Sequence, residues 1–460
     1  MTTPSIVWFR QDLRLEDQPA LLAAARDGPV IPVYVLDDQT PGRWKIGGAQ
    51  RWWLHHSLDT LRQSLERIGS RLILRRGSAV EELERLASAL GIRRVHAIGH
   101  YEPWWRESER EVGGALDLVI HGGDVLVLPE QVRTGSGTPY KIYTPYWRAL
   151  QEQLPPSLPQ PGPQKLDAPG EWPDSDELAS WSLLPTNPDW AVRFGDEWAP
   201  GEATALQRLD QFCGRSEHYP EQRDLPGEEG TSRLSPHLHF GEISPRLIWH
   251  TLPEGLGEKF RKELAWRDFS HNVMLTQPSI GEQAGRREFD AFPWRTGPDA
   301  EVDFNAWTRG RTGYPIVDAG MRQLWETGWM HNRVRMITAS FLVKHLLINW
   351  RRGVEWFWDT LVDADYGNNA QNWQWVAGTG LDSQPFNRIM APTTQAAKFD
   401  AAGYIRRWVP ELADQGDEAI LDPSKLSRTA YPAPIIAHQQ ARERALAALR
   451  EFVGASPTTS

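Results

Sequence analysis

The order of apolar segments in the first 130 residues constrains the fold more than any other feature of this sequence. Strands are predicted at the short apolar runs SIVWFRQDL (5–13), PVIPVYVLDD (29–38), RLILRRGS (71–78), VHAIGHYE (95–102) and DVLVLPE (124–130). Helices are predicted over residues 49–69 and 79–91, where apolar positions recur at helical spacing. The alternation predicts an α/β domain over residues 1–130, built on an open, Rossmann-like parallel sheet.

A parallel sheet of this kind binds its ligand at the carboxyl ends of its strands. The segments that leave the predicted sheet at that edge are WFRQDLR (8–14) and GHYEPWWRE (99–107). No GxGxxG motif follows the first strand. The sequence therefore does not predict an ordinary dinucleotide site at this sheet.

Proline-rich segments separate this domain from the rest of the chain. LPPSLPQPGPQ and LPTNPDWAVRFGDEWAP lie between residues 154 and 200 and have no repeating period. They predict an interdomain linker over residues 131–200, which is either a long ordered connector or a partly mobile segment. Beyond it the spacing is helical almost to the end, which predicts an all-helical domain over residues 201–460.

The composition limits the cellular compartment, the possible disulfides and the possible metal sites. The single cysteine, Cys213, excludes an intramolecular disulfide and a cysteine-ligated zinc or iron–sulfur site, and no other metal site is predicted. No apolar run is long enough to span a membrane and no signal-peptide pattern occurs, so we expect a cytoplasmic protein. The formal net charge is −10, yet six of the seven charged residues between Met321 and Arg352 are basic, so positive charge is local.

Hydroxyl side chains precede an amphipathic run in GTSRLSPHLHFGEISP (230–245). Thr231, Ser232 and Ser235 come just before Pro236, which opens the run. Hydroxyls and free backbone N–H groups at a helix start form an anion site suited to a diphosphate. The alternative is a serine N-cap followed by proline at the first helical position.

Two later helical segments carry polar side chains at spacings that bring them together. In KELAWRDFSHNVML (262–275), Glu263, Trp266 and Arg267 occupy positions i, i+3 and i+4. They form either one side of a binding pocket or a salt-bridged helix surface. In WMHNRVRMITASFLVKHLLINW (329–350), an amide and a thioether lie at i and i+4 while two arginines point elsewhere. That pattern indicates a pocket floor lined by both polar and apolar groups, with phosphate contacts nearby.

The segment DTLVDADYGNNAQNWQW (359–375) combines paired acids with paired tryptophans. Asp363 and Asp365 precede two asparagines, but the glycine and the terminal glutamate of an EF-hand are missing. The acids therefore suit hydrogen bonds from sugar hydroxyls and arginines. Trp373 and Trp375 are two residues apart on a predicted helix, so their indoles should face different surroundings.

Four motifs in this order, GTSRLS, ELAWRDF, TGYPIVDAGMRQL…GWMHNRVRM and NWQW, resemble the DNA photolyase and cryptochrome family. The resemblance runs from IVWFRQDLRLEDQPAL to FDAAGYIRRWVPEL, across nearly the whole chain. It implies an antenna chromophore in the N-terminal domain and FAD in a U-shaped conformation in the helical domain. It also implies a basic surface over which DNA docks.

The resemblance also implies residues for the cofactor. The flavin set comprises Tyr219, Thr231, Ser232, Arg233, Leu234, Ser235, Arg267, Asn332, Arg335, Asp363, Asp365 and Asn369. Asn369 matches the residue that faces flavin N5, and an Arg335–Asp363 pair is expected beside the isoalloxazine. An asparagine there suits hydrogen bonding to the reduced flavin.

Further positions match the family's substrate site and its electron path. Residues typical of cyclobutane pyrimidine dimer (CPD) photolyases are Glu263, Trp266, Asn332, Met336 and Trp375. Enzymes for the (6-4) photoproduct have a histidine in place of Met336, because their reaction uses a general acid. The implied phosphate contacts are Arg223, Arg333 and Arg388. The implied tryptophan wire is Trp373, Trp350 and Trp294.

The segment NNAQNWQWVAGTGLDSQPFNRIMAP resembles most closely the class III branch, which suggests methenyltetrahydrofolate as the antenna. Tyr101 and Glu102 are followed by Trp104 and Trp105, where the class I pattern has asparagine and glutamate for the pterin. An 8-hydroxy-deazaflavin or an empty cleft therefore remains an alternative. The alternative for the two indoles is packing in the core.

The resemblance implies a light-driven lyase that uses reduced FAD to split dimers in UV-damaged duplex DNA. A monomer is the default expectation. The alternatives are a signalling cryptochrome, whose usual mark is an extended C-terminal tail, and a DASH-type enzyme for single-stranded DNA. Only ASPTTS follows the last predicted helix, which argues against the signalling alternative.

Overall fold

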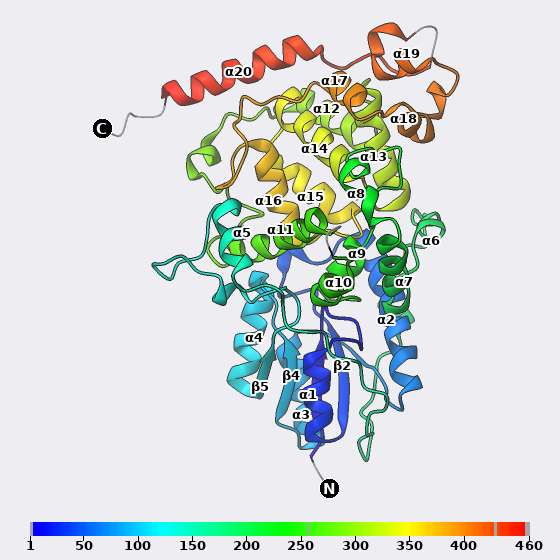
Figure 1. Ribbon diagram of the computed structural model, residues 1–460, viewed down its shortest axis with the longest axis vertical. Helices are drawn as coiled ribbons and strands as arrows, with labels where there is room; N and C mark the ends of the chain where they lie inside the picture. The colour runs from blue at the N-terminus through cyan, green and yellow to red at the C-terminus, as the bar shows by residue number, and fades with distance from the viewer. Residues whose placement is uncertain (1–2, 255–256, 427–429, 456–460) are drawn as a thin grey trace. The chain divides into compact units, whose positions relative to one another are not determined.

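The computed structural model describes residues 3–254, 257–426 and 430–455 (Figure 1). The chain forms two compact units, called here the first and second units. The first unit comprises Met1–Glu217, Ser232–Pro278 and Val362–Gly367. The second unit comprises His218–Thr231, Ser279–Leu361 and Asn368–Ser460. No helix in the described part of the chain is both long and apolar enough to cross a membrane.

The first unit is built on a five-stranded parallel sheet (Figure 1). Its strands are β1 (Ser5–Phe9), β2 (Val30–Leu36), β3 (Ile73–Arg76), β4 (Arg94–Ile98) and β5 (Asp117–His121), in the spatial order β3-β2-β1-β4-β5. β1 and β2 are buried along their whole length, as expected for inner strands of a parallel sheet with covered faces. The expected open α/β fold is confirmed.

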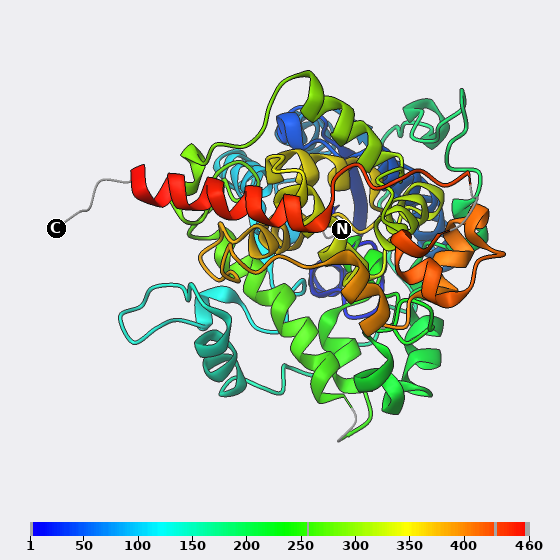
Figure 2. The ribbon, with the colours of Figure 1, turned by 90° about the horizontal axis from the view of Figure 1, so that it is seen from above.

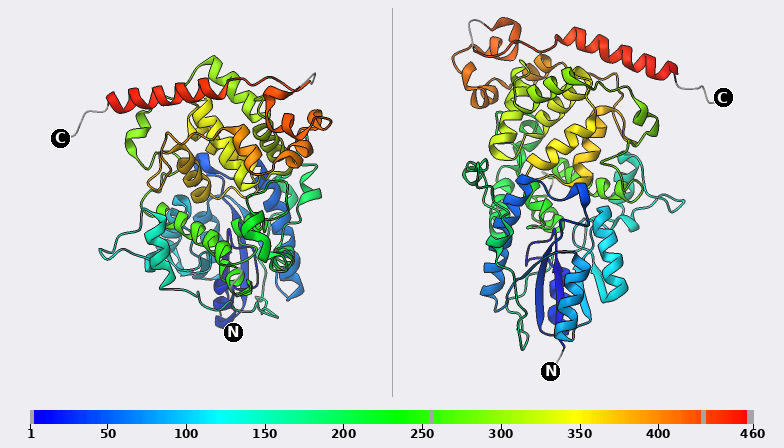
Figure 3. Two further views of the ribbon diagram at one scale, coloured as in Figure 1. Left: turned by 45° about the horizontal axis from the view of Figure 1, so that its top comes forward. Right: turned by 180° about the vertical axis from the view of Figure 1, so that it is seen from behind.

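Helices cover the sheet as right-handed crossovers require. They are α1 (Pro19–Asp27), α2 (Gly48–Arg67), α3 (Ala79–Leu90) and α4 (Pro103–Ala115). α3 and α4 lie side by side, and their Leu83 and Val112 join Trp8 and Val33 of the sheet in one core cluster. Figure 1 shows α1 in front of the sheet, and the view from behind in Figure 3 shows α3 and α4.

The prediction of the fifth strand was wrong. Residues 124–127 form bends and Pro129 begins a 3-10 turn, and β5 is instead the preceding segment DLVIH, an edge strand. Val125, Leu126 and Val127 are nevertheless buried, and Asp268 satisfies two of their backbone amides: Oδ2 accepts from the amides of Leu126 at 2.9 Å and Val127 at 3.3 Å. In sequence, a short buried apolar run has the same pattern whether it forms a strand or a loop whose backbone is hydrogen-bonded by a side chain.

The proline-rich segment lies within the first unit and makes main-chain hydrogen bonds to it. The amide of Leu166 donates to the carbonyl of Ile68 and that of Asp176 to Leu74, both at 2.9 Å. The remaining helices of the first unit are α5 (Tyr143–Gln151), α6 (Phe194–Glu197), α7 (Glu202–Cys213), α9 (Ser235–His239), α10 (Pro245–Thr251) and α11 (Glu258–Met274). Short 3-10 turns occur in the chain at Gly42–Trp44, Pro129–Gln131, Leu178–Trp181, Ser216–His218, Arg287–Ala291, Pro410–Leu412 and Pro423–Lys425.

The described residues of the second unit contain helices and no strand, as predicted for this part of the chain. The helices are α8 (Tyr219–Gln222), α12 (Pro298–Thr308), α13 (Pro315–Thr327), α14 (Asn332–Ser340), α15 (Trp350–Thr360), α16 (Tyr366–Ala377), α17 (Pro392–Lys398), α18 (Ala402–Trp408), α19 (Asp417–Leu421) and α20 (His438–Ala455). α16 enters this unit at Asn368. A single π-helical turn, Phe341–His345, follows α14.

The C-terminal helix α20, red in Figures 2 and 3, packs on the π-helical turn. His438 Nδ1 lies 2.8 Å from His345 Nε2, and Ala445 and Phe452 join a cluster with Phe289 and its neighbours. Burial lowers the pKa of His345 to about 3, so the pair is neutral at physiological pH. The helix is therefore anchored at its start by a hydrogen bond and along its length by apolar contacts.

Candidate active site

Helix α11 carries the first group of predicted site residues, all in the first unit. Glu263 and Trp266 lie one turn apart and are half-buried. Arg267 points elsewhere: it is buried, donates to the main-chain carbonyl of Asp124, and places Nη2 2.5 Å from the Asp124 carboxylate. The predicted triplet therefore divides into a pair at a partly accessible surface and a buried arginine.

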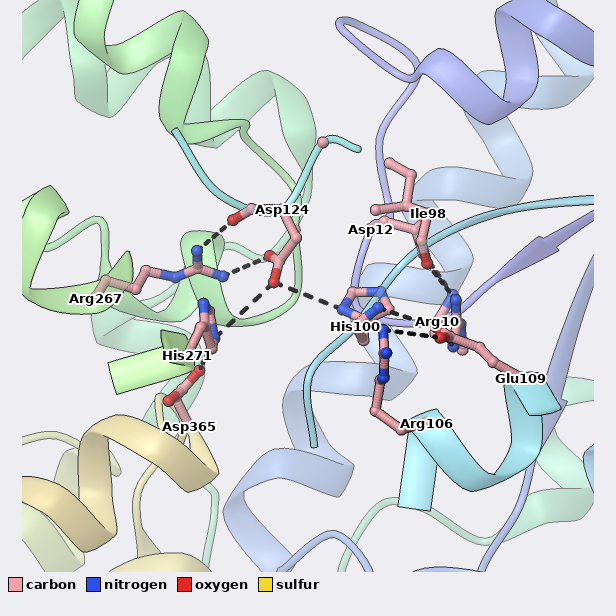
Figure 4. Close-up of polar contacts among 12 residues, drawn as sticks. Arg10, Asp12, Ile98, His100, Arg106, Glu109, Asp124, Arg267, His271 and Asp365 are labelled. Carbon is pink, nitrogen blue, oxygen red and sulfur yellow. Dashed lines mark hydrogen bonds and ion pairs between the residues drawn. The ribbon is translucent and has the colours of Figure 1, made fainter. Parts of the chain in front are cut away.

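Arg267 belongs to a buried charged cluster that Figure 4 shows. Asp124 Oδ2 lies 3.7 Å from His100 Nδ1 and 3.9 Å from His271 Nε2, and His271 Nε2 lies 3.5 Å from Asp365 Oδ2. Burial alone would raise the pKa of Asp124, but Arg267 and the two histidines outweigh it and hold that pKa well below its usual range. The cluster ties α11 to the loop that precedes α16.

The same cluster fixes the charge of one predicted flavin residue. Burial opposes ionisation of Asp365, yet the hydrogen bond and charge of His271 lower its pKa below the usual range. Burial and Arg267 disfavour the charged form of His271, but Asp365 and Asp124 outweigh them and raise its pKa. Asp365 is therefore held as a carboxylate beside a protonated imidazole.

The predicted hydroxyl loop has an unusual backbone. Arg233 has a φ of 54°, in the left-handed region, and its guanidinium lies 3.1 Å from Glu197 Oε2 and 4.6 Å from the Trp198 ring centroid. Ser232 Oγ accepts from the amide of Leu234 at 3.3 Å. The alternative of a serine N-cap is wrong. Leu234 occupies the N-cap position of the short helix α9 and makes no side-chain capping hydrogen bond, and Ser235 is the exposed first residue of that helix.

Helix α14 carries the second group, in the second unit. The guanidinium of Arg333 lies 2.7 Å from Asp224 Oδ1 and donates to the Met336 sulfur at 3.5 Å. The same guanidinium lies over the ring of Phe399. Arg223 Nε lies 3.8 Å from the same Asp224 oxygen, so two of the predicted phosphate contacts share one carboxylate. The third, Arg388, is exposed.

Helix α16 separates its two tryptophans as predicted. Trp373 is buried against Phe357 and Trp307, with ring centroids 5.0 and 6.2 Å away, whereas Trp375 is half-buried. A Cβ at Gly353 would lie 2.1 Å from the Trp373 ring, so only glycine fits there. Asn369 is half-buried and donates from Nδ2 to the carbonyl of Val354 at 3.1 Å, which directs Oδ1 away from that carbonyl.

Comparison with known proteins gives the family. Residues 5–164 match the family model for DNA photolyase, and residues 260–451 match the FAD binding domain of DNA photolyase. The deoxyribodipyrimidine photo-lyase of Agrobacterium fabrum is 49% identical over 474 residues, covering 97% of this chain and 98% of that protein. The chain belongs to the DNA photolyase and cryptochrome family.

Solved structures of the family agree with the fold. A bacterial class III photolyase from Agrobacterium tumefaciens matches with a TM-score of 0.94 and 48% identity, over 99% of this chain and 98% of that one. An archaeal photolyase from Sulfolobus tokodaii, solved with two FAD molecules, matches with a TM-score of 0.84 and 30% identity, over 97% of this chain and 100% of that one. Cryptochrome-2 of Arabidopsis thaliana is more distant, at 35% identity over 99% of this chain and 81% of that protein.

The family's cofactor is FAD, and the residues present fit it. The predicted flavin residues in the first unit are Ser232, Arg233, Leu234, Ser235, Arg267, Asp363 and Asp365. Those in the second unit are Tyr219, Thr231, Asn332, Arg335 and Asn369. Ser235 presents an exposed hydroxyl, and the bond from Asn369 to Val354 leaves its amide oxygen as an acceptor. Hydroxyl donors for phosphates and an amide acceptor for a ring N–H are the groups that a reduced flavin nucleotide requires.

The predicted tryptophan wire lies entirely in the second unit. Trp350 is fully buried with the Arg351 guanidinium 4.8 Å from its ring, and Trp294 packs against Phe292 at 4.6 Å. Within the described residues, Trp350 makes no ring-to-ring contact with Trp373 or Trp294. The wire remains a prediction.

The residues predicted to contact an antenna chromophore have unlike surroundings. Tyr101 stacks on His271 with ring centroids 5.6 Å apart, and Trp104 packs against Tyr366 at 5.1 Å. Burial raises the pKa of Glu102, whose carboxyl is almost fully enclosed. Trp105 instead packs against the sheet core beside Trp8, as the core alternative anticipated.

Sequence reasoning missed the residues that organise the predicted site residues of the first unit. His271 follows Arg267 by four residues on one helix face, a spacing that could have pointed to it. Asp124 and His100 gave no such signal, because each lies in a loop far from α11 in the sequence. Tyr143, which stacks on Trp266, was likewise hidden in the connector.

Proposed function

We propose that this protein repairs UV-damaged DNA by splitting cyclobutane pyrimidine dimers under blue light, as a deoxyribodipyrimidine photo-lyase. The observation that carries the proposal is the 49% identity to a photo-lyase over 97% of the chain, together with the side chain at Met336. The Met336 sulfur accepts a hydrogen bond from Arg333. A thioether cannot donate a proton, which favours dimer splitting over (6-4) repair.

Substrate binding would proceed by extrusion of the dimer from the duplex. A dimer pairs and stacks poorly, so flipping it costs only a few kcal/mol. The half-buried indoles of Trp266 and Trp375 offer stacking surfaces, and Glu263 offers a hydrogen-bond acceptor to the bases. Arg223, Arg333 and Arg388 would bind phosphates and fix the register without reading the sequence.

When bound in its reduced form, FAD would supply the light-driven electron that opens the cyclobutane ring. The residues expected to hold it are the two sets described above, with Asn369 Oδ1 accepting from the ring N–H. Asp365 contributes a fixed negative charge, because His271 keeps it ionised. Trp373 would deliver electrons that reduce the oxidised cofactor.

The proposal also concerns the identity of the antenna chromophore. Methenyltetrahydrofolate is favoured by the likeness to a class III photolyase, with Tyr101, Glu102 and Trp104 as candidate contacts. An 8-hydroxy-deazaflavin, a second FAD as in the archaeal relative, or no antenna are the alternatives. Extraction of the purified protein, identification of the released chromophores by mass spectrometry and measurement of the molar ratio of FAD to protein separate these four outcomes.

We further propose that the protein acts as a monomer on duplex DNA in the cytoplasm. The primary test is repair of a thymine dimer in a duplex by the reduced protein under blue light, followed as the returning ultraviolet absorbance of the bases, with a dark control. Recovery only in light supports the proposal. Absence of recovery with reduced FAD bound favours a signalling cryptochrome, and recovery confined to single-stranded DNA favours a DASH-type enzyme.

A further inference from the structure

The Tyr143 ring stacks flat on the Trp266 indole. Their ring centroids are 3.6 Å apart and the ring planes differ by 7°. Most other ring pairs in the first unit meet edge to face with centroids about 5 Å or more apart. One face of the Trp266 indole is therefore covered by a phenol ring from the connector helix α5.

Two further contacts hold the same helical turn. The Tyr143 hydroxyl donates to the carbonyl of Lys262 at 3.0 Å, so the phenol is anchored to the residue just before Glu263. Phe269 meets both rings edge to face, with its centroid 5.7 Å from each. The indole of Trp266 is thus fixed on one face by Tyr143 and at its edge by Phe269.

Helix α5 is itself held against α11 independently of this stack. Tyr146, three residues after Tyr143, is fully buried and contacts Phe269 with centroids 5.2 Å apart. Asn272 donates from its side-chain amide to the carbonyl of Tyr140 at 2.7 Å. These contacts on both sides of Tyr143 keep the phenol in place and do not involve Trp266.

We propose that Tyr143 is a positioning residue for lesion binding, because it holds the Trp266 indole ready to stack on the extruded dimer. The inference rests on the proposed dimer-splitting function. An indole that is free to rotate must be ordered when the dimer binds, and that ordering weakens binding. Tyr143 removes this cost in advance and leaves the opposite face of Trp266 to the substrate.

The hydroxyl and the ring of Tyr143 can be separated by substitution. Tyr143→Phe keeps the stack and loses the bond to Lys262, whereas Tyr143→Leu loses the stack and keeps an apolar side chain. We expect Tyr143→Leu to weaken binding of dimer-containing duplex in the dark by about tenfold and to leave binding of undamaged duplex unchanged. Tyr143→Phe should bind both duplexes like the parent protein. Under saturating light, Tyr143→Leu should raise KM and leave kcat unchanged.

The outcomes distinguish this inference from the function on which it rests. If the parent holoprotein itself does not prefer dimer-containing DNA, the proposed function and the inference both fail. If the parent prefers it and Tyr143→Leu keeps the same preference, only the positioning role fails. An equal loss on both duplexes, or an equal loss in Tyr143→Phe, also overturns it. If Tyr143→Leu does not fold with FAD bound, Tyr143→His replaces it. Its smaller ring covers less of the Trp266 indole, so this variant should lose part of the preference for dimer-containing duplex, and an unchanged preference overturns the positioning role.

Discussion

Glu263 is the residue whose proposed role is most directly testable. It is half-buried on the turn of α11 that Tyr143 anchors, one turn before Trp266. A carboxylate at that position can accept hydrogen bonds from the bases and stabilise the dimer as it receives the electron. Its neighbours on the same helix include Glu258, an exposed carboxylate 2.7 Å from Lys262 Nζ.

Replacing Glu263 with alanine should reduce repair by about tenfold or more, the usual effect of losing one charge-assisted hydrogen bond. The visible absorbance of bound FAD should not change. The measurement is the rate of dimer loss per absorbed light for the parent and the variant. Glu258→Ala, on the same helix, should repair normally, and normal repair by Glu263→Ala would remove the proposed bond.

Asp268 is a buried acid whose titration should be visible in the protein's stability. Burial raises its pKa to about 7, although Arg267 opposes the shift. The folded state therefore prefers the protonated carboxyl. The stabilisation is complete below the unfolded value near 3.8 and is lost as the pH rises through about 7.

Asp268→Asn keeps an oxygen that can accept from the amides of Leu126 and Val127 but removes the titration. We expect the variant to match the parent near pH 4 and to exceed it above pH 7 by up to about 4 kcal/mol, from a shift of roughly three pH units. Denaturant unfolding at a series of pH values measures the difference. A variant less stable than the parent at pH 8 would show that the charged carboxylate supports Arg267.

At the scale of elements, sequence periodicity predicted side-chain positions correctly where the residues concerned lie on a single helix. The spacing of Glu263 and Trp266 placed both on one side of α11, and the spacing of Trp373 and Trp375 gave the two indoles different surroundings. Periodicity could not find the partner of Arg267, because Asp124 lies in a loop far away in the sequence. It also misread residues 124–130, where a side-chain carboxylate replaces strand pairing.

Helix α16 allows a test of the predicted electron path. Trp373→Phe should strongly slow the light-driven reduction of oxidised FAD, because phenylalanine is much harder to oxidise than tryptophan. Repair by protein reduced chemically beforehand should be nearly unchanged. The matched control is Trp307→Phe, which alters a buried indole in contact with Trp373 that is outside the predicted wire. Equal slowing in both variants would mean that the path leaves Trp373 through Trp307.

At the scale of the whole molecule, the alternation of short apolar runs with amphipathic stretches predicted the parallel sheet correctly. The order of four motifs predicted the family, which the comparisons confirm. The site was predicted only as a set of residues by resemblance. Which of them face a ligand depends on contacts such as Arg267 with Asp124 and Arg333 with Asp224. Asp124 belonged to a run that was predicted to be a strand, and Asp224 lay outside every motif that carries the resemblance.

The charge distribution of the whole chain leads to a final prediction. A protein with a formal net charge of −10 can bind DNA only where basic residues concentrate, so each phosphate contact should be measurable by its salt dependence. Arg388→Ala should weaken binding of damaged and undamaged duplex to the same extent and lower the slope of log affinity against log salt by about 1. Arg110→Ala, a substitution of an exposed arginine on α4 whose guanidinium lies 3.6 Å from Glu107 Oε1, should leave the slope unchanged. A loss confined to damaged DNA would mean that Arg388 contacts the lesion itself, since a phosphate contact does not distinguish the two duplexes.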